Sequence, residues 1–429
     1  MGKRNKITFI DLFAGCGGLS EGFLQTGKYE ALAHVEWELP MIRTLRSRLV
    51  SKWNHTEEDA LKRAVCFDIQ KTDEMLNGQW SEKTNESYGD SNHSSVAEKG
   101  LRGIVGKQKV NLIIGGPPCQ AYSIAGRAQD RDSMKYDYRN YLFESFVRVV
   151  DAFRPDAFVF ENVPGLLSAK PGDIPVPARI YEAFLAIGYE IRKSALLKKA
   201  VYTASDFGVP QKRNRAIIVG VRIDSELDLE ELYSNIDLQQ VKTEKRDVRD
   251  AIGHLPPLYP LDKPVKLKGR NISHSMNGSL PVRFHEPRFH NERDIGIFVE
   301  WLTRNMNRAS SQEKIAFYND LMGKRSNHAK YRNLEWDKPS PTVVAHLYKD
   351  GLMFIHPDIK QARSITVKEA ALLQSFPDDF VFEGSQGACY KMIGNAVPPL
   401  MAKHLALGIS EYIECKQKKE EENESIGSL

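Results

Sequence analysis

Residues 7–18, ITFIDLFAGCGG, decide the fold of this chain. The first seven residues are rich in β-formers and predict a strand, and the AGCGG that follows predicts a tight turn. The next residues, LSEGFL at 19–24, can open a helix. A glycine turn between a strand and a helix lets the backbone approach a ligand at the helix N-terminus, which favours a nucleotide-like cofactor. The match to the dinucleotide pattern GxGxxG is imperfect, because Ser20 stands at its last position.

The same alternation continues along the chain. Further strands are predicted at the short apolar runs 31–35, 110–114, 157–160 and 216–221, and helices at 141–153 and 177–187. Strands that alternate with helices predict an α/β fold with a mostly parallel sheet. Such sheets bind ligands beyond the carboxyl ends of their strands. Residues 366–376 predict an amphipathic helix that starts with a capping box, with Thr366 as N-cap and Glu369 three positions later.

Two segments interrupt this rhythm. Residues 78–109 are polar and poor in apolar side chains, which indicates a surface insertion or a mobile loop. Residues 236–331 contain six prolines and no regular alternation, which indicates a second, irregular domain inserted into the first. We therefore predict a first domain in two parts, 1–235 and 332–415, and a frayed charged tail at 416–429.

Charge is distributed unevenly. The chain has 60 Lys and Arg against 56 Asp and Glu, a net charge of +4. Residues 241–335 carry 18 against 11, a local charge of +7, and five of the eleven His. A basic middle on a near-neutral body favours contact with a polyanion, although a solvated surface explains the charge equally well. With 41% hydrophobic residues and no apolar run of 18, the sequence excludes a disordered chain and a membrane-spanning one.

The cysteines are few and scattered. They are Cys16, Cys66, Cys119, Cys389 and Cys415, and they form no CxxC pair. They therefore predict neither a disulfide framework nor a structural zinc site. The basic N-terminus is followed by no long apolar stretch, so no secretory signal is expected. In the reducing compartment that this implies, a single cysteine can act as a thiol nucleophile.

Three predicted strand ends carry features that suit an adenosine. Glu36 stands about 20 residues after the glycines, where an acid can bind ribose hydroxyls. Trp37 can stack on an adenine, and Asp68 with Ile69 offers another carboxylate beside an apolar wall. Each acid alone is more often a surface or capping residue. The three in order predict a bound adenosine without deciding which cofactor carries it.

A loop of glycines and prolines places a cysteine at a strand end. The segment GGPPCQ covers residues 115–120, and its Cys119 points from a strand end toward the expected crevice. A buried structural thiol is the usual state of a free cysteine, and we expect it for the other four. Glycine and proline pack poorly, however, so Cys119 is predicted to be a nucleophile.

Two further segments offer an acid and two bases. Glu161 directly follows the apolar run at 157–160, so it is either a partly desolvated proton donor or a carboxylate that caps the next element. Taken alone, this stretch of sequence favours a carboxylate that caps the next element. Arg213 and Arg215 precede the strand at 216–221 and share one face, which suits a phosphate or a polarised carbonyl. A solvated strand start is the common alternative.

Together these segments resemble the DNA cytosine-5 methyltransferase family. The motifs are DLFAGCGG at 11–18, PPCQ at 117–120, ENV at 161–163, QKRNR at 211–215, Arg332 with Pro341 and Thr342, and GNAVPP at 394–399. Six motifs in order are far more specific than any one of them. The resemblance implies an S-adenosylmethionine-dependent class I methyltransferase fold, a Rossmann-like α/β mixed sheet. The first domain is then catalytic, and 236–331 is a target-recognition domain.

The resemblance also implies the chemistry. The Cys119 thiolate attacks C6 of a flipped-out cytosine, and C5 then takes a methyl group from S-adenosylmethionine, leaving S-adenosylhomocysteine. Glu161 offsets the charge at the ring N3, and Arg215 acts near O2 with Arg213 in support. The motifs do not identify the base that removes the C5 proton, and a water is as suitable as a side chain.

The motifs imply two further sets of contacts. Cofactor contacts are implied at Phe13, Ala14, Gly15, Gly17, Glu36, Trp37, Asp68, Ile69, Pro117, Leu142, Asn395 and Ala396. DNA contacts are implied at Gln120, Ser123, Arg127, Arg332 and Thr342, and no metal site is implied. Asn395 stands far along the chain from the first motif, so the C-terminal helix is expected to pack back beside the N-terminal strand.

The expected partner is double-stranded DNA, with no membrane and no obligatory protein partner. One chain holds every motif, so a monomer suffices. The expected setting is the cytoplasm of a bacterial or phage host cell, in a restriction–modification system. Three alternatives stay open: a tRNA cytosine-5 methyltransferase, a catalytically silent DNA-binding relative, and a nicotinamide-dependent dehydrogenase. The long basic insert argues against the tRNA enzyme. The intact Cys119 and Glu161 argue against the silent relative, and the imperfect glycine pattern argues against the dehydrogenase.

Overall fold

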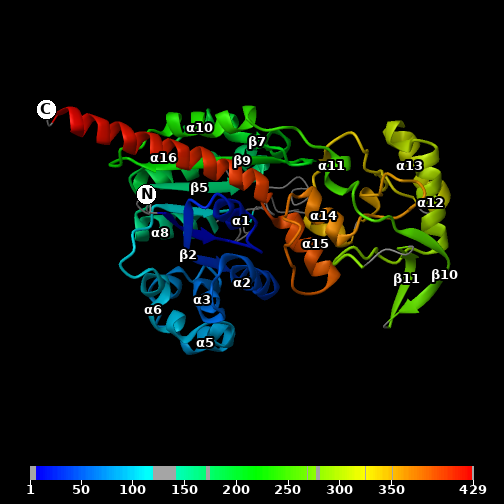
Figure 1. Cartoon of the computed structure of the whole chain (residues 1–429), viewed down its shortest axis with the longest axis horizontal. Coiled ribbons are helices and arrows are strands. Elements are labelled where there is room, and N and C mark those ends of the chain that lie inside the picture. The colour runs from blue at the N-terminus through cyan, green and yellow to red at the C-terminus, as the bar shows by residue number, and fades with distance from the viewer. Residues whose placement is uncertain are drawn as a thin grey trace.

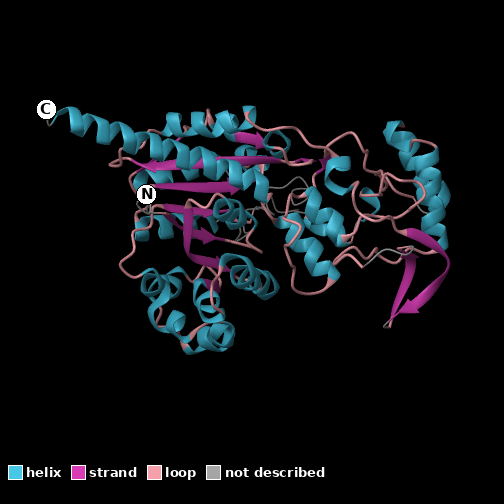
Figure 2. Cartoon of the chain, in the orientation of Figure 1, coloured by secondary structure: helices cyan, strands magenta, loops and turns pink. Residues whose placement is uncertain are grey.

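The computed structural model shows two lobes side by side (Figure 1). It describes residues 6–118, 142–170, 174–267, 269–276, 281–323, 325–349 and 351–427, with the backbone alone for Leu267 and 417–427. The larger lobe holds the central sheet, and the smaller lobe holds a two-stranded hairpin and short helices (Figure 2). No helix in this part of the chain has both the length and the hydropathy of a membrane span.

The central sheet has eight strands and is mixed. They are β1 (Ile7–Leu12), β2 (Tyr29–Glu36), β3 (Ala64–Cys66), β4 (Leu112–Gly115), β5 (Ala157–Asn162), β6 (Tyr189–Ile191), β7 (Val201–Thr203) and β9 (Asn214–Arg222). Their order is β3-β2-β1-β4-β5-β9-β6, and β7 also pairs with β9. β1 to β5 run parallel, whereas β9 is antiparallel to β5, β6 and β7. The predicted strands are confirmed, and the carboxyl ends of β1 to β5 share one edge.

Apolar side chains cover both faces of the sheet. In β1, Phe9 belongs to one core cluster and Ile10 to the other, as expected for a strand buried on both sides. The first face is covered by α1 (Gly18–Gln25), α10 (Leu229–Val241) and α16 (Pro399–Gly427). The second is covered by α4 (Thr72–Asn77), α6 (Ser94–Val105), α8 (Leu142–Phe153) and α9 (Val176–Ala186). α8 and α9 confirm the predicted helices, apart from residue 141, which lies outside the described residues. α2 (Leu39–Trp53) and α3 (Glu57–Arg63) pack beside β3.

α16 brings the C-terminal part of the chain back to the start of the sheet. Tyr29 Oη donates a hydrogen bond to Ala406 O (2.7 Å). Gly22 of α1 lies so close to Pro399 and Ala402 that any side chain there would clash with them. The predicted return of the C-terminal helix is therefore confirmed.

The segment 78–109 is helical, so the mobile-loop interpretation is wrong. It forms α5 (Glu82–Tyr88) and α6, and it buries Val96, Leu101 and Val105 in the core cluster of the second sheet face. These apolar residues are few, but their spacing along α6 places them against the core. Average composition hides such a pattern, and for that reason the segment looked loop-like.

The smaller lobe contains the hairpin of β10 (Tyr259–Leu267) and β11 (Arg270–Ser275), with α12 (Glu292–Thr303) and α13 (Ser311–Met322) packed around Trp301. The short helices α11 (Val248–Ile252), α14 (Val367–Leu373) and α15 (Gln386–Asn395) lie between the lobes (Figure 1). α10 runs across residue 236 and buries Ile236 against the sheet. The packing therefore favours a start of the inserted domain after Val241.

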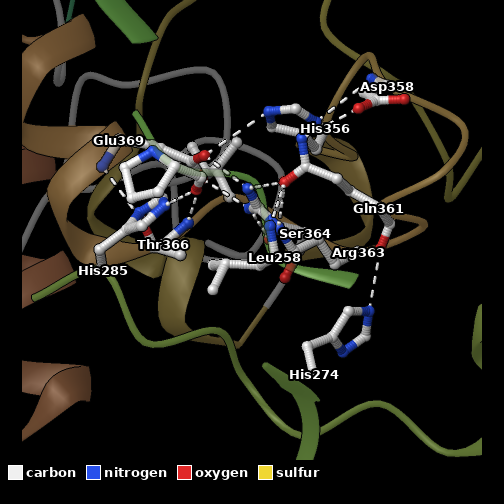
Figure 3. A network of polar contacts seen from close by, with 12 residues as sticks. Leu258, His274, His285, His356, Asp358, Gln361, Arg363, Ser364, Thr366 and Glu369 are labelled. Carbon is white, nitrogen blue, oxygen red and sulfur yellow. Dashed lines mark hydrogen bonds and ion pairs between the residues drawn. The ribbon is translucent and has the colours of Figure 1, made fainter. Parts of the chain in front are cut away.

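A buried polar network joins the hairpin to α14 (Figure 3). Gln361 Oε1 accepts hydrogen bonds from Leu258 N (2.9 Å) and Arg363, and His274 Nε2 donates to Gln361 O (2.9 Å). Arg363 makes two 2.7 Å hydrogen bonds to Glu369. Burial raises the pKa of Glu369, but the Arg363 charge and its hydrogen bonds outweigh burial and hold that pKa well below its ordinary value.

Candidate active site

The glycine turn joins β1 to α1 at the carboxyl edge of the sheet. Phe13, Gly15 and Gly17 adopt left-handed backbone with φ of 58°, 57° and 91°, and Gly17 is the N-cap of α1. A Cβ on Gly17 would lie 2.6 Å from the Leu45 side chain, so only glycine fits there. The turn leads directly into the N-terminus of α1, whose free backbone N–H groups suit a nucleotide-like ligand.

The Glu36 carboxylate ties the end of β2 to the glycine turn. Its Oε2 accepts a hydrogen bond from Gly15 N (2.9 Å), and its Oε1 accepts from Trp37 N (2.9 Å) and Glu38 N (2.8 Å). Burial raises the pKa of Glu36 to about 7, although the backbone hydrogen bonds oppose the shift. The Trp37 side chain is 53% exposed, so its indole is open to a stacking partner.

β3 ends beside β2 and carries the next acid. Cys66 pairs with Glu36 in the sheet, and Phe67 N donates a hydrogen bond to Glu36 O (3.0 Å). Asp68 follows and is half-buried, and Ile69 is buried in the core. The features expected for an adenosine therefore lie on neighbouring strand ends.

Residues from the other end of the chain complete this edge. A Cβ on Gly18, the first residue of α1, would lie 2.6 Å from Val397 O and 3.0 Å from Ala396 Cβ. Ala396 is half-buried, and Asn395, the last residue of α15, is exposed. Leu142, at the start of α8, is buried in the core cluster on which Phe13 also packs. The turn and the last motif thus meet in space.

A carboxylate and a guanidinium lie two strands from β1 along the same edge. Glu161 Oε1, at the end of β5, is 2.6 Å from Arg215 Nε, and both side chains are 12% exposed. Gly116 follows β4, and a Cβ there would lie 2.5 Å from Glu161 Oε2. The carboxylate is therefore set directly against the backbone that leads into the predicted catalytic loop.

The start of that loop is fastened to β5. Asn162 Nδ2 donates a hydrogen bond to Pro117 O (3.2 Å), and Pro117 is buried. The predicted nucleophile and three predicted DNA contacts lie outside the described residues: Cys119, Gln120, Ser123 and Arg127. The structure thus positions the groups that flank the loop.

Comparison with known proteins now decides the family. The model of the C-5 cytosine-specific DNA methylases matches residues 7–79 and 71–411. The chain belongs to this family. The methylase is 34% identical over 450 residues to the type II methyltransferase M.Bpa9945I of Bacillus paralicheniformis, covering 94% of this chain and 98% of that one. It is 31% identical over 432 residues to the type II methyltransferase M.DdeI of Desulfomicrobium norvegicum, covering 95% and 89%.

Solved structures agree with this fold. The methylase is similar to a prophage-encoded protein of E. coli with a TM-score of 0.58 and 22% identity, covering 95% of this chain and 100% of that one. It is also similar to the S. pombe Dnmt2 methyltransferase with a TM-score of 0.52 and 13% identity, covering 96% and 100%. The α/β fold with a mixed sheet is thus shared with methyltransferases. The family makes this chain a DNA cytosine-5 methyltransferase.

The Arg213 side chain of the methylase binds backbone carbonyl groups rather than a ligand. Its side chain is 1% exposed, and it donates hydrogen bonds to Val343 O (2.8 Å), Gly394 O (2.9 Å) and Ala396 O (3.1 Å). Burial also lowers its pKa. The prediction that Arg213 and Arg215 present two guanidiniums to one ligand is therefore wrong, because only Arg215 lies at the carboxylate. Arg213 is a positioning residue.

Gln211 acts like Arg213 and is not among the residues predicted from sequence. It is fully buried, and its Oε1 accepts a hydrogen bond from Val343 N (2.9 Å). Its Nε2 donates to Leu373 O (3.3 Å) and to the Gln374 side chain. Gln211 lies two residues before Arg213, so the period of a strand, which puts both on one face, is the signal that finds it.

The other two residues expected at DNA lie where the lobes join. Thr342 follows β12 (Ser340–Pro341), which pairs with β8 (Gln211–Lys212), and its Oγ1 donates to Lys212 O (2.9 Å). Arg332 is half-buried over the Phe354 ring, 5.9 Å from its centroid, and burial lowers its pKa. Its Nε is buried without a hydrogen-bond partner among the described residues.

The hairpin of the smaller lobe carries exposed positive charge. Lys263 and Lys266 on β10 and Arg270 on β11 are all exposed. The hairpin also projects from its lobe (Figure 1). This part of the methylase therefore offers a basic surface to a polyanion.

Proposed function

We propose that the methylase is the modification enzyme of a type II restriction–modification system, as its relatives are type II methyltransferases. It modifies double-stranded DNA in the cytoplasm of a bacterial or phage host cell, as a monomer. Its cofactor is S-adenosylmethionine, which leaves as S-adenosylhomocysteine. The observation that carries the mechanism is the Glu161–Arg215 pair set against Gly116, just before the Cys119 loop.

The residues at the carboxyl edge fit this cofactor. Gly17 holds the left-handed turn at the start of α1, and the Glu36 carboxylate can accept hydrogen bonds from ribose hydroxyls. The exposed indole of Trp37 suits an adenine ring, with Asp68 and Ile69 at the next strand end. Bound there, S-adenosylmethionine supplies an electrophilic methyl group.

The cytosine needs activation because its C5 is a poor nucleophile. Attack of Cys119 Sγ on C6 forms a C–S bond and pushes ring electrons toward C5 and N3. C5 then accepts the methyl group. Loss of the C5 proton to a base and β-elimination break the C–S bond and release the thiolate.

Glu161 and Arg215 match the edge of the cytosine ring. N3 and O2 are adjacent on the cytosine ring, and a carboxyl beside a guanidinium can face both of them. A 2.6 Å pair with both side chains 12% exposed holds the carboxyl in one orientation before the base arrives. In this arrangement Glu161 and N3 share one proton when the thiolate attacks, and Arg215 stabilises the charge that develops at O2.

The reacting atoms lie inside the duplex, so the base must be flipped out. Residues 242–331, the predicted insert without the end of α10, are proposed as the target-recognition domain. The exposed Lys263, Lys266 and Arg270 support phosphate contacts by this domain. The half-buried Arg332 and the half-buried Thr342 are proposed as further DNA contacts.

Transfer of a tritiated methyl group from S-adenosylmethionine to unmethylated duplex DNA, with tRNA in parallel, tests the proposal. Label is expected in DNA as 5-methylcytosine. Cys119→Ser is expected to abolish the label and still bind S-adenosylhomocysteine. Cys415 was expected to be buried, and that prediction is wrong, because it lies exposed on α16. Cys415→Ser is therefore the matched control with unchanged activity. Label in tRNA alone would overturn the substrate, and normal turnover by Cys119→Ser would overturn the covalent mechanism.

A further inference from the structure

The side chain of Asn92 covers the edge of the sheet at β3. Cys66 N donates a hydrogen bond to Asn92 Oδ1 (2.7 Å), and Asn92 Nδ2 donates to Cys66 O (2.8 Å) and Tyr88 O (2.9 Å). β3 is an edge strand of three residues. A primary amide that binds both the N–H and the C=O of one residue takes the place of a neighbouring strand. Arg46 supports the same corner by donating to Ala64 O (2.9 Å) and Asn92 Oδ1 (3.3 Å).

Phe67, the residue after β3, is held by two aromatic rings from the insertion. Trp80 stacks on Phe67 with ring centroids 4.7 Å apart, and Tyr88 lies against it at 4.9 Å. Trp80 Nε1 is itself fixed, because it donates to Glu74 O (3.1 Å). Such contacts fix the ring of Phe67 and with it the local backbone.

The insertion docks through two facing glycines. Gly78 and Gly100 have φ of 71° and 59°, and a Cβ on either would collide with backbone of the facing segment. This close approach lets α6 bury Val96 and Leu101 in the core cluster that also contains Ile69. The insertion is therefore anchored to the body independently of Asn92.

These contacts converge on residues 66–69, the link between β3 and the proposed cofactor contacts. On its other side the link is tied to β2, because Phe67 N donates to Glu36 O (3.0 Å). Asp68 and Ile69 therefore stand between the Glu36 strand and the insertion. Asn92 reaches the cofactor site only through this backbone.

We propose that residues 78–109 brace the cofactor site, and that Asn92 is the positioning residue that fixes Asp68 and Ile69 through Cys66. This inference rests on the proposed cofactor site. Without the amide, the N–H and C=O of Cys66 lose their partner and the link 66–69 can shift. The cofactor must then order the link when it binds, so its affinity falls while the chemical step is unaffected.

Calorimetric titration with S-adenosylhomocysteine tests the brace. Asn92→Ala is expected to raise the Kd about tenfold. Asn92→Asp keeps the acceptor for Cys66 N but loses the donor to Cys66 O, so a smaller rise is expected. Asn85→Ala, at an exposed asparagine of α5, is the matched control with a Kd within about twofold of wild type. At saturating cofactor, turnover of Asn92→Ala on DNA is expected to stay close to wild type.

An unchanged Kd in folded Asn92→Ala overturns the proposal. A parallel loss of DNA affinity and melting temperature also overturns it, because that pattern marks general loss of structure. If Asn92→Ala does not fold, the same two criteria apply to Asn92→Asp. Failure of the proposed function is distinguishable, since wild-type protein would then not bind S-adenosylhomocysteine and Glu36→Ala would change nothing.

Discussion

Glu161 and Arg215 stand on strands that run in opposite directions, and their side chains meet at 2.6 Å. Glu161 pairs with Ile217 in the β5–β9 ladder, so Arg215 lies two residues further toward the start of β9. Because β9 is antiparallel, its first residues lie at the edge where β5 ends. The reversed direction of β9 therefore brings the Arg215 guanidinium to the carboxyl edge of the parallel strands.

Glu161→Gln is expected to lower kcat by about 10²–10⁴ while the Kd for S-adenosylhomocysteine stays unchanged. The amide cannot share a proton with N3 of the cytosine. The kcat of Arg215→Ala is expected to fall by a similar factor. Single-turnover methyl transfer measures both variants. Arg222→Ala, at the other end of β9, is the control and is expected to react at the wild-type rate. Full activity of Glu161→Gln would remove this carboxyl from the chemistry.

Gly116→Ala is expected to damage the same step from the opposite side. The new methyl group would lie 2.5 Å from Glu161 Oε2, so the carboxylate must shift from its present position beside Arg215. We expect kcat to fall on the order of tenfold or more with little change in melting temperature. Gly296→Ala in α12, where a Cβ meets open space, is the control and should be neutral or stabilised by about 0.5–1 kcal/mol. An active Gly116→Ala would show that the carboxylate position is not critical.

Cofactor affinity is expected to depend on pH through Glu36. Burial raises its pKa to about 7, so the group becomes protonated as the pH falls below that value. A protonated carboxyl is a poorer acceptor for ribose hydroxyls, and the Kd for S-adenosylhomocysteine should therefore rise by up to about tenfold per pH unit below the pKa. Glu36→Gln should bind weakly with a flatter pH profile. A wild-type Kd that is constant from about pH 8 to about pH 6 would contradict this role.

The buried histidines of the smaller lobe predict sensitivity to acid. Burial lowers the pKa of His274 to about 4 and those of His290 and His356 to about 3. The unfolded chain binds their protons near pH 6.5, so stability is complete above that pH and is lost as the pH falls toward the folded values. The melting temperature is expected to be lower at about pH 5 than at about pH 7.5. His274→Gln should make this difference in melting temperature smaller. Equal melting temperatures in the wild type would refute this account.

Local patterns were sufficient for much of the fold. The strand at Ile7–Leu12 is confirmed because β-formers and a glycine turn act on their own neighbours. The capping box is confirmed for the same reason: Thr366 accepts from Glu369 N, and the Glu369 side chain accepts from Thr366 N. The Cys119 loop and most of the named contacts were predicted from motifs. For contacts on described residues the position is now known, and the role remains a prediction.

Long-range packing accounts for what could not be predicted. Strand alternation puts Arg213 and Arg215 on one face, but the partners of Arg213 lie 130, 181 and 183 residues away in sequence. The residues next to Arg213 in the sequence do not indicate these partners. The packing of 78–109 against the body likewise includes the close approach of Gly78 and Gly100, a contact between two segments whose composition alone indicates a loop.

The position of α16 has a consequence for biosynthesis. Phe9, Phe23 and Tyr29 leave the ribosome early, yet Met401 and Leu405 of α16 complete the cluster that covers them. During translation this sheet face stays open to chaperones and to aggregation. The residues beside the glycine turn, Ala396 and Val397, come just before α16 and are also made late. Both this sheet face and the surroundings of the glycine turn are therefore completed only when translation is nearly finished.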